Sequence, residues 1–137
     1  MNLIAQGIDM VDCARFKEAM ERHGQKFLGR VFTPVELEYC LGKKRKVEHL
    51  AGRFAAKEAV LKVLGTGWRS GICWTDIEVQ NEPSGQPQVY LSGRCRQIAD
   101  ERGVTRILVS ISHIKTHAIA SAVGCAEAPG GAPGTGQ

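Results

Sequence analysis

The stretch at residues 53–67, RFAAKEAVLKVLGTG, constrains the fold more than any other part of the chain. Ala, Leu, Lys and Glu are good helix formers, and no helix breaker occurs in this stretch before Gly65. Apolar residues recur at steps of three and four, with small alanines between them that let a neighbouring element approach closely. Gly65 is the residue expected where a left-handed cap ends a helix. The stretch therefore predicts a long, mostly buried helix at the centre of the fold.

Four charged side chains, those of Arg53, Lys57, Glu58 and Lys62, interrupt this helix. Glu58 and Lys62 stand four residues apart, so these two share one face of the helix. Two interpretations follow from the spacing. The pair is either a structural ion pair, worth roughly 0.2–0.5 kcal/mol, or the floor of a functional site. The choice between them depends on polar residues elsewhere in the chain.

The size and composition of the chain exclude several classes of protein. A length of 137 residues suits one domain with a hydrophobic core. No apolar run is long enough to span a bilayer, and the N-terminus lacks the basic region of a signal peptide. Five scattered cysteines without a CxxC pair argue against a disulfide framework and against structural zinc. We therefore expect a cytoplasmic protein with reduced thiols and no membrane partner, and its net charge of +4 favours an anionic partner.

Turn and cap residues divide the rest of the chain into short helices and strands. Asp12 is a typical helix N-cap, and Gly24 is expected to stop the helix that Asp12 begins. Thr33, Pro34 and Glu36 form a capping-box pattern that starts another helix. The expected helices cover residues 13–23, 25–31, 34–41 and 93–102, and the expected strands cover residues 3–11, 76–80, 88–91, 106–112 and 117–123. The last two strands are apolar, so both are expected to be central in a sheet.

Polar residues occur at two further places where packing alone would not put them. Asp9 lies among the apolar residues of the first strand. It is either a strand-end carboxylate that caps the next helix or a metal ligand, because an ionised carboxylate near a core needs a cation or hydrogen-bond donors. His113 follows Ser112 at the end of an apolar strand, where a histidine is more often a structural hydrogen-bonding residue.

Basic residues are concentrated in two segments. Arg15, Arg22 and Arg30 could form one surface with Lys26 along the first helical region, as a solvated face or as a docking patch for an acidic partner. The run at residues 43–46, KKRK, leads into the central helix. Such a run is usually solvated, but here it could also meet a phosphate group.

Three segments resemble, in order, the three signatures of the bacterial holo-acyl-carrier-protein synthases, the small branch of the 4′-phosphopantetheinyl transferases. They are GIDMVDCAR near the N-terminus, the central GRFAAKEAVLKVLGTG and the later VSISH. The resemblance covers about residues 3–124. It implies an α+β fold of the phosphopantetheinyl transferase type, with a small antiparallel sheet packed against the long central helix. We expect this domain to occupy residues 1–124, followed by a disordered Gly/Pro-rich tail at residues 125–137.

The resemblance also implies a reaction. The enzymes move the phosphopantetheine arm of coenzyme A onto a serine of an acidic apo-acyl carrier protein of fatty acid biosynthesis, release adenosine 3′,5′-bisphosphate and need Mg²⁺. Asp9 and Glu58 match the metal-binding acids, with waters and the pyrophosphate completing the shell. Lys62 would face the pyrophosphate and assist the departing phosphate. Either Glu58 or a metal-bound water would take the proton from the carrier serine, and Asp9, Glu58 and Lys62 form the expected catalytic set.

Further site residues are carried over from the same resemblance. Residues expected to contact the nucleotide or its phosphates are Lys44, Arg53, Lys62, Gly65, Thr66 and His113, with the turn at residues 84–87 bordering the adenine. Arg15 matches a carrier-contacting arginine, and Arg22 and Arg30 extend that surface. The resemblance further implies a homotrimer with its sites at subunit interfaces.

A basic, non-enzymatic nucleic-acid-binding module is the competing hypothesis. It would use the lysine run and the arginines of the first helical region. An aromatic content of 6% offers no stacking platform for bases. It also leaves Asp9 and Glu58 unexplained, because carboxylates repel phosphate unless a metal intervenes. We therefore expect coenzyme A and a carrier protein as partners, and no nucleic acid.

Overall fold

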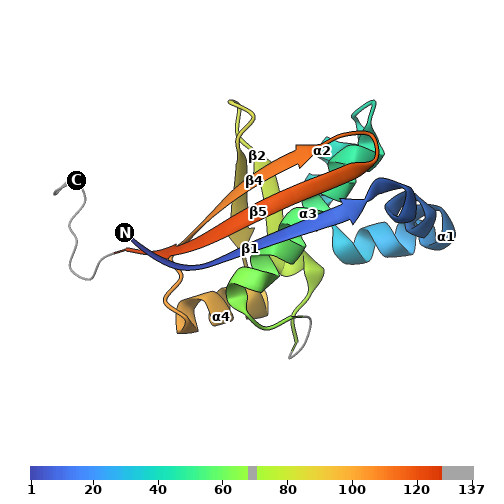
Figure 1. Cartoon of the computed structure of the whole chain (residues 1–137). Helices are drawn as coiled ribbons and strands as arrows, with labels where there is room; N and C mark the ends of the chain where they lie inside the picture. The colour runs from blue at the N-terminus through green and yellow to red at the C-terminus, as the bar shows by residue number, and fades with distance from the viewer. Residues whose placement is uncertain (68–70, 128–137) are drawn as a thin grey trace.

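A three-stranded antiparallel sheet lies against one long helix, and a separate hairpin stands beside them (Figure 1). The computed structural model describes residues 1–67 and 71–127. The sheet has the order β1-β5-β4, and the hairpin consists of β2 and β3. The elements are β1 (Asn2–Asp12), α1 (Cys13–Val31), α2 (Pro34–Leu41), α3 (Lys46–Leu64), the short 3-10 helix η1 (Trp74–Asp76), β2 (Ile77–Asn81), β3 (Pro87–Leu91), α4 (Gly93–Glu101), β4 (Arg106–His113) and β5 (His117–Ala126). No described helix is long and apolar enough to cross a membrane.

The central helix α3 is longer than the sequence pattern indicated. It begins at Lys46, inside the basic run, and ends as expected before Gly65, whose φ of 75° is left-handed. Nearly all of its residues after the first turn are buried, because α1 and α2 cover part of it and the sheet covers another side. Gly52 lets β4 approach, since a Cβ there would lie 2.9 Å from Cγ2 of Ile111.

The predicted caps of α1 and α2 are confirmed. Oδ1 of Asp12 accepts hydrogen bonds from the backbone N–H groups of Ala14 and Arg15, at 2.9 and 3.1 Å. Gly24 has a φ of 55° and kinks α1 where the sequence predicted a break between two helices. At α2, the Glu36 side chain accepts from the backbone of Thr33, and the Thr33 side chain accepts from the backbone of Glu36.

The core divides into two clusters along α3. The first joins α1 and α2 to the first half of α3, where the rings of Phe16 and Phe54 lie 5.5 Å apart. The second joins the second half of α3 to α4 and the hairpin, around Val60, Ile77 and Ile98. Figure 1 shows the same division, with α1 and α2 near one end of the sheet and α4 near the other.

Two expectations about the last strands need correction. β5 is central, but β4 is an edge strand of its sheet, and its alternate residues Leu108, Ser110 and Ser112 are exposed. β5 also continues to Ala126, which pairs with Asn2, so the first residues of the expected tail belong to the sheet. The remaining expectation of disorder concerns residues 128–137, which lie outside the described residues. β5 extends this far because the first residues of β1 also need backbone hydrogen-bond partners, which the end of β5 supplies.

Candidate active site

The close packing of β1 on α3 is the feature that builds the site. A Cβ at Gly7 would clash with the carbonyl oxygen of Ala59 and would lie 2.8 Å from Cβ of Lys62. Only glycine therefore fits where the strand crosses this turn of the helix. The crossing brings the next residues of β1 beside Lys62, whose Nζ donates to the carbonyl oxygen of Ile8 at 2.6 Å and lies 3.5 Å from Oδ1 of Asp9.

Asp9 and Glu58 lie on adjoining elements in the same region of the site. β1 and α3 run in opposite directions (Figure 1), and the crossing at Gly7 fixes which turn of the helix each strand residue faces. Asp9 is two residues beyond Gly7 on the same face of β1, and Glu58 directly precedes Ala59. Both carboxylates are partly exposed, and Lys62 is exposed beside them. The structure thus brings the three expected catalytic residues to one seam between strand and helix.

A second polar group surrounds Arg53 on α3. Its side chain is only 3% exposed, and Nη2 donates to Oδ1 of Asn81 at the end of β2. The guanidinium carbon lies 4.4 Å from the ring centre of Tyr39, a cation–π contact. Nε of Arg53 is buried and has no hydrogen-bond partner among the described residues. This arginine is held rigidly and retains a free donor.

His113 lies in the same region as Arg53, at the end of β4. Nδ1 of His113 is 2.8 Å from Oε1 of Glu48, and because an ionised carboxylate only accepts, His113 donates this bond. The ring of His49 packs against that of His113 at 5.0 Å. Burial, and then the neighbouring charges of His113 and Arg53, lower the pKa of His49. Arg53 and His113 line one cavity of about 130 Å³ together with Gly85 of the hairpin turn and Pro87, the first residue of β3.

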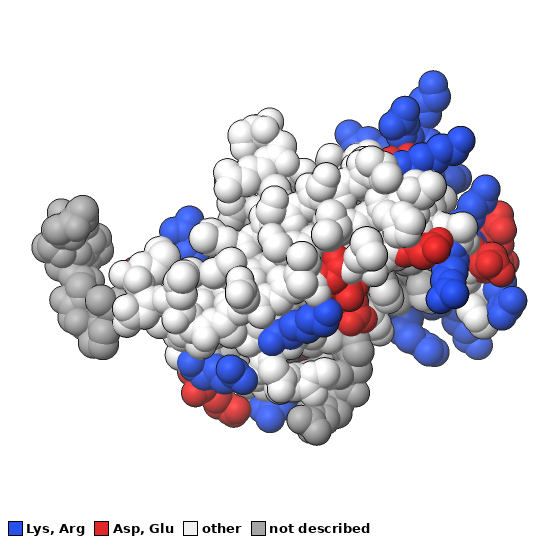
Figure 2. Space-filling view, viewed as in Figure 1, with Lys and Arg blue, Asp and Glu red and all other residues white. Residues whose placement is uncertain are grey.

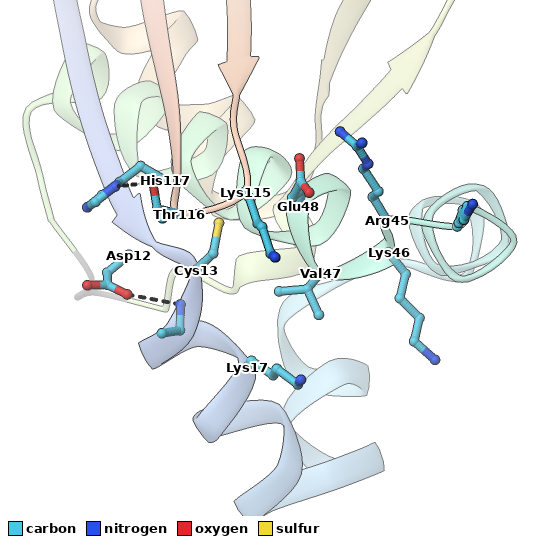
Figure 3. Close-up of a pocket in the computed structure, with 12 residues that line it drawn as sticks. Asp12, Cys13, Lys17, Arg45, Lys46, Val47, Glu48, Lys115, Thr116 and His117 are labelled. Carbon is cyan, nitrogen blue, oxygen red and sulfur yellow. Dashed lines mark hydrogen bonds between the residues drawn. The ribbon is translucent and has the colours of Figure 1, made fainter.

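A cavity of about 630 Å³ lies elsewhere, between the first turns of α1 and α3 and the turn that joins β4 to β5 (Figure 3). Its charged lining residues are Asp12, Lys17, Lys44, Arg45, Lys46, Glu48 and Lys115, and His117 also lines it. Figure 3 shows Lys17 and Lys115 reaching into it from opposite sides. Cations outnumber acids here, so the cavity suits an anionic group.

The sequence signatures and the solved structures of known proteins agree on the family. The sequence model of the 4′-phosphopantetheinyl transferase superfamily matches residues 5–122. This chain belongs to that superfamily. A holo-[acyl-carrier-protein] synthase of Koribacter versatilis is 43% identical over 121 residues, which cover 88% of this chain and 97% of the relative.

Two solved synthases confirm the phosphopantetheinyl transferase fold. The Neisseria meningitidis holo-[acyl-carrier-protein] synthase has a TM-score of 0.81 and 31% identity, over 89% of this chain and 98% of that chain. The Helicobacter pylori holo-[acyl-carrier-protein] synthase, in complex with coenzyme A, has a TM-score of 0.78 and 33% identity, over 88% and 100% of the two chains. The expected α+β architecture, a small antiparallel sheet on a long helix, is therefore confirmed.

The nucleotide residues expected of a phosphopantetheinyl transferase do not all meet within one chain. Lys44 lines the large cavity, whereas Arg53 and His113 line the small one. Gly65 and Thr66 follow the far end of α3, about 18 Å of helix from Arg53 at 1.5 Å per residue. Thr66 donates only to its neighbour, the carbonyl of Gly67, at 3.1 Å.

The expected carrier-binding arginines are all exposed on α1. Arg15 lies in its first turn, whereas Arg22 and Arg30 lie on opposite sides of the kink at Gly24. Figure 2 shows Lys and Arg gathered at the α1 and α2 end of the molecule, while the visible face of the sheet is almost free of charge. The kink places the three arginines on two helical segments rather than on one straight stripe.

Four residues that structure the transferase site were not indicated by the sequence pattern. Tyr39 and Asn81 contact Arg53, Glu48 holds His113, and Lys57 is fully buried beside Glu58. Their partners lie far away in the chain, so no local spacing pointed to them. The sequence offered one indication, Lys57 itself, which is a charged residue within a stretch whose apolar pattern otherwise predicts a buried helix.

Proposed function

We propose that this protein is a holo-[acyl-carrier-protein] synthase, which transfers 4′-phosphopantetheine from coenzyme A to a serine of an apo-acyl carrier protein. The seam between β1 and α3 carries the proposal, because it unites two partly exposed carboxylates with an ammonium in a member of this family. Curated relatives carry this name, and the Helicobacter pylori synthase binds coenzyme A. The comparisons favour this reaction over the basic nucleic-acid-binding module.

The chain's own residues suit phosphoryl transfer, in which positioning and charge stabilisation dominate. The carrier serine attacks the phosphorus attached to pantetheine, and the bond to the second phosphate breaks, releasing adenosine 3′,5′-bisphosphate. Lys62 is exposed beside Asp9, where its ammonium would stabilise the charge that develops on the departing phosphate. Glu58 is one helical turn from Lys62 and would accept the serine proton, directly or through water.

The donor set at the seam fits Mg²⁺. Asp9 and Glu58 supply hard carboxylate oxygens, and no group of three or more potential metal-ligating side chains occurs among residues 1–67 and 71–127. Mg²⁺ commonly takes one or two protein carboxylates and fills its shell with water and substrate phosphates. Asp9 and Glu58 would hold the ion, which when bound supplies charge neutralisation for the diphosphate.

We propose that the phosphates and adenine of coenzyme A contact Arg53, His113, Lys44, Gly65 and Thr66. The unpartnered Nε of Arg53 supports this assignment for the small cavity, where a phosphate oxygen would satisfy it. The excess of cations around Lys44 supports a phosphate contact in the large cavity. Gly65 and Thr66 follow the opposite end of α3 from Arg53, and we propose that a second copy of the chain brings such groups together at one nucleotide site.

The outer face of the sheet supports assembly into a homotrimer. Ile8 and Met10 of β1 are 57% and 64% exposed, and Leu108 and Ile119 of the neighbouring strands are exposed beside them. Uncharged atoms dominate this face in Figure 2. A contiguous apolar face of this kind marks an interface. Association of copies through it would cover these side chains and supply the second half of each site.

The basic end of the molecule supports docking of the acidic carrier protein. Arg15, Arg22 and Arg30 would steer the carrier to α1, whose first residue directly follows β1 and its Asp9. We place the reaction in the cytoplasm, since all five cysteines are free thiols, as expected in a reducing compartment.

One experiment tests the reaction directly. Purified protein is incubated with apo-acyl carrier protein, coenzyme A and Mg²⁺, and the carrier is weighed by mass spectrometry. A mass increase equal to one phosphopantetheine on the carrier serine is expected. An unchanged carrier mass, with a known synthase active in parallel, would refute the proposed function.

A further inference from the structure

A fully buried ion pair between α2 and α3 has no part in the proposed chemistry. Nζ of Lys57 lies 2.8 Å from Oε1 of Glu36, and neither side chain is accessible to solvent. Burial lowers the pKa of the Lys57 ammonium, and the facing carboxylate opposes that shift. Isolated buried charges are strongly unfavourable, so both groups need a full set of partners.

Those partners lie on the free edge of β2 and on η1, which precedes it. Nζ of Lys57 also donates to the carbonyl oxygens of Ile77 and of Trp74, the latter at 3.1 Å. Oε2 of Glu36 accepts from the backbone N–H of Val79 at 2.7 Å. Ile77 and Val79 are alternate residues of β2, which pairs only with β3 in the described part of the chain. The Lys57 ammonium donates to the backbone of β2, and the Glu36 carboxylate accepts from it. The ion pair thus makes the kind of hydrogen bonds with β2 that a neighbouring strand would make.

Arg53 extends the same line of contacts. It stands four residues before Lys57, so both project from one face of α3. Lys57 contacts the start of β2 at Ile77, Glu36 contacts its middle at Val79, and Arg53 contacts its end at Asn81. Three attachments at alternate residues fix the position of the hairpin along α3. The hairpin then carries Gly85 and Pro87 to the cavity that Arg53 and His113 line.

We propose that Glu36 and Lys57 are positioning residues that hold the β2–β3 hairpin in register with α3, so that its turn completes the coenzyme A site. The inference rests on the proposed function, since it assigns the nucleotide to that cavity. Lys57 touches no reacting atom in this proposal. Its neighbour Glu58 faces the seam with β1, while Lys57 is bonded to the hairpin on another side of the same helix.

The test uses the double variant Glu36→Gln/Lys57→Met beside each single variant. Removing one partner leaves an uncompensated buried charge, so the single variants are expected to be poorly folded. The double variant removes both charges and is expected to melt well above either single variant. Glu101→Gln, which breaks the exposed Arg94–Glu101 pair on α4, is the matched control and is expected to behave as the wild type.

Steady-state kinetics of the folded double variant separate positioning from stability. The KM for coenzyme A is expected to rise at least about tenfold, because the hairpin is no longer held in register. The KM for the apo-carrier is expected to stay within about twofold, because α1 is untouched. A stability defect alone would lower the active fraction and hence the apparent kcat, leaving both KM values unchanged, and that result would overturn the proposal.

Hydrogen exchange on the wild-type protein tests the same idea without any substitution. The Val79 amide is expected to exchange as slowly as the amides that join β1 to β5. Exchange as fast as that of the exposed residues 84–86 would also overturn the proposal. Failure of the wild type to bind coenzyme A in calorimetry, or to modify the carrier, would instead refute the proposed function itself.

Discussion

Nζ of Lys62 lies 3.5 Å from Oδ1 of Asp9, although 53 residues separate them in the chain. The contact exists because β1 crosses α3 at Gly7, the one residue type that lets the strand backbone reach the helix backbone at that point. The chemistry proposed for the seam therefore depends on a packing contact made by a residue that has no functional group.

Gly7→Ala is expected to damage both stability and turnover. The added methyl group would meet the Ala59 backbone, which cannot move as a flexible side chain does. Such overpacking typically costs about 1–3 kcal/mol of unfolding free energy. Chemical denaturation and the carrier mass assay measure the two effects. Gly29→Ala is the control, because a Cβ at Gly29 meets nothing within 4 Å, and equal unfolding free energies for the two variants would contradict the prediction.

Glu58→Gln is expected to lower kcat by at least about a hundredfold while leaving the fold intact, because it removes a carboxylate that serves as metal ligand or as proton acceptor. Circular dichroism would check the fold, and the mass assay would follow turnover. Asp100→Asn, on the exposed face of α4, is the control for loss of one surface carboxylate. Full activity of Glu58→Gln would exclude both roles for this residue.

Arg15→Ala is expected to raise the KM for the apo-carrier several-fold and to leave the KM for coenzyme A unchanged. The exposed guanidinium on α1 would attract the acidic carrier, and such attraction weakens with salt. The salt dependence of kcat/KM should therefore be shallower in the variant than in the wild type. Arg94→Ala, on α4, serves as the control. Equal changes in both KM values would argue against a docking role.

Met10→Glu is expected to weaken assembly. The residue is 64% exposed on the outer face of the sheet, next to Ile119 on β5. A carboxylate there would have to be desolvated when copies associate. Light scattering after gel filtration would give the mass of the wild type as three chains and a lower mass for the variant. Val35→Glu, on exposed α2, should leave the mass unchanged. A wild-type mass of one chain would refute the trimer.

Stability is expected to fall as the pH drops below about 6.5, the ordinary pKa of histidine. Burial lowers the pKa of His49 in the folded state, so the unfolded chain binds the proton more readily. His113, Arg53 and Lys43 also disfavour the charged ring, whereas Glu48 favours it. The contribution of His49 is thus complete above the unfolded pKa and is lost progressively below it. Melting temperatures of wild type and His49→Gln should converge on acidification, and parallel curves would contradict this account.

Local features of the fold were predictable from the sequence, because each depends on residues a few positions apart. The Thr33–Glu36 capping box, the break at Gly24 and the left-handed Gly65 all follow from this kind of short-range chemistry. The start of α3 was placed too late, because the prediction rested on the stretch that begins at Arg53, whereas the helix begins at Lys46. β4 was expected to be central because it is apolar, although among the described residues it pairs only with β5.

Contacts between distant elements were not predictable from spacing. Glu36 was recognised as a capping residue, but its second oxygen serves Val79, 43 residues later. The meeting of Asp9 with Lys62 was expected only through the resemblance to a known family. That Lys44 lines one cavity while Arg53 and His113 line another could be seen only in the structure, because it depends on contacts among residues far apart in the chain.

The kink of α1 at Gly24 affects the shape of the surface on which α1 could bind a carrier protein. A straight helix would present its cations along a single line, which suits a partner with one acidic ridge. The bent helix instead carries Arg30 on a separate segment from Arg15 and Arg22. A rounded acidic partner resting in that bend would touch both segments at once, and straightening the bend would leave it held on one side only.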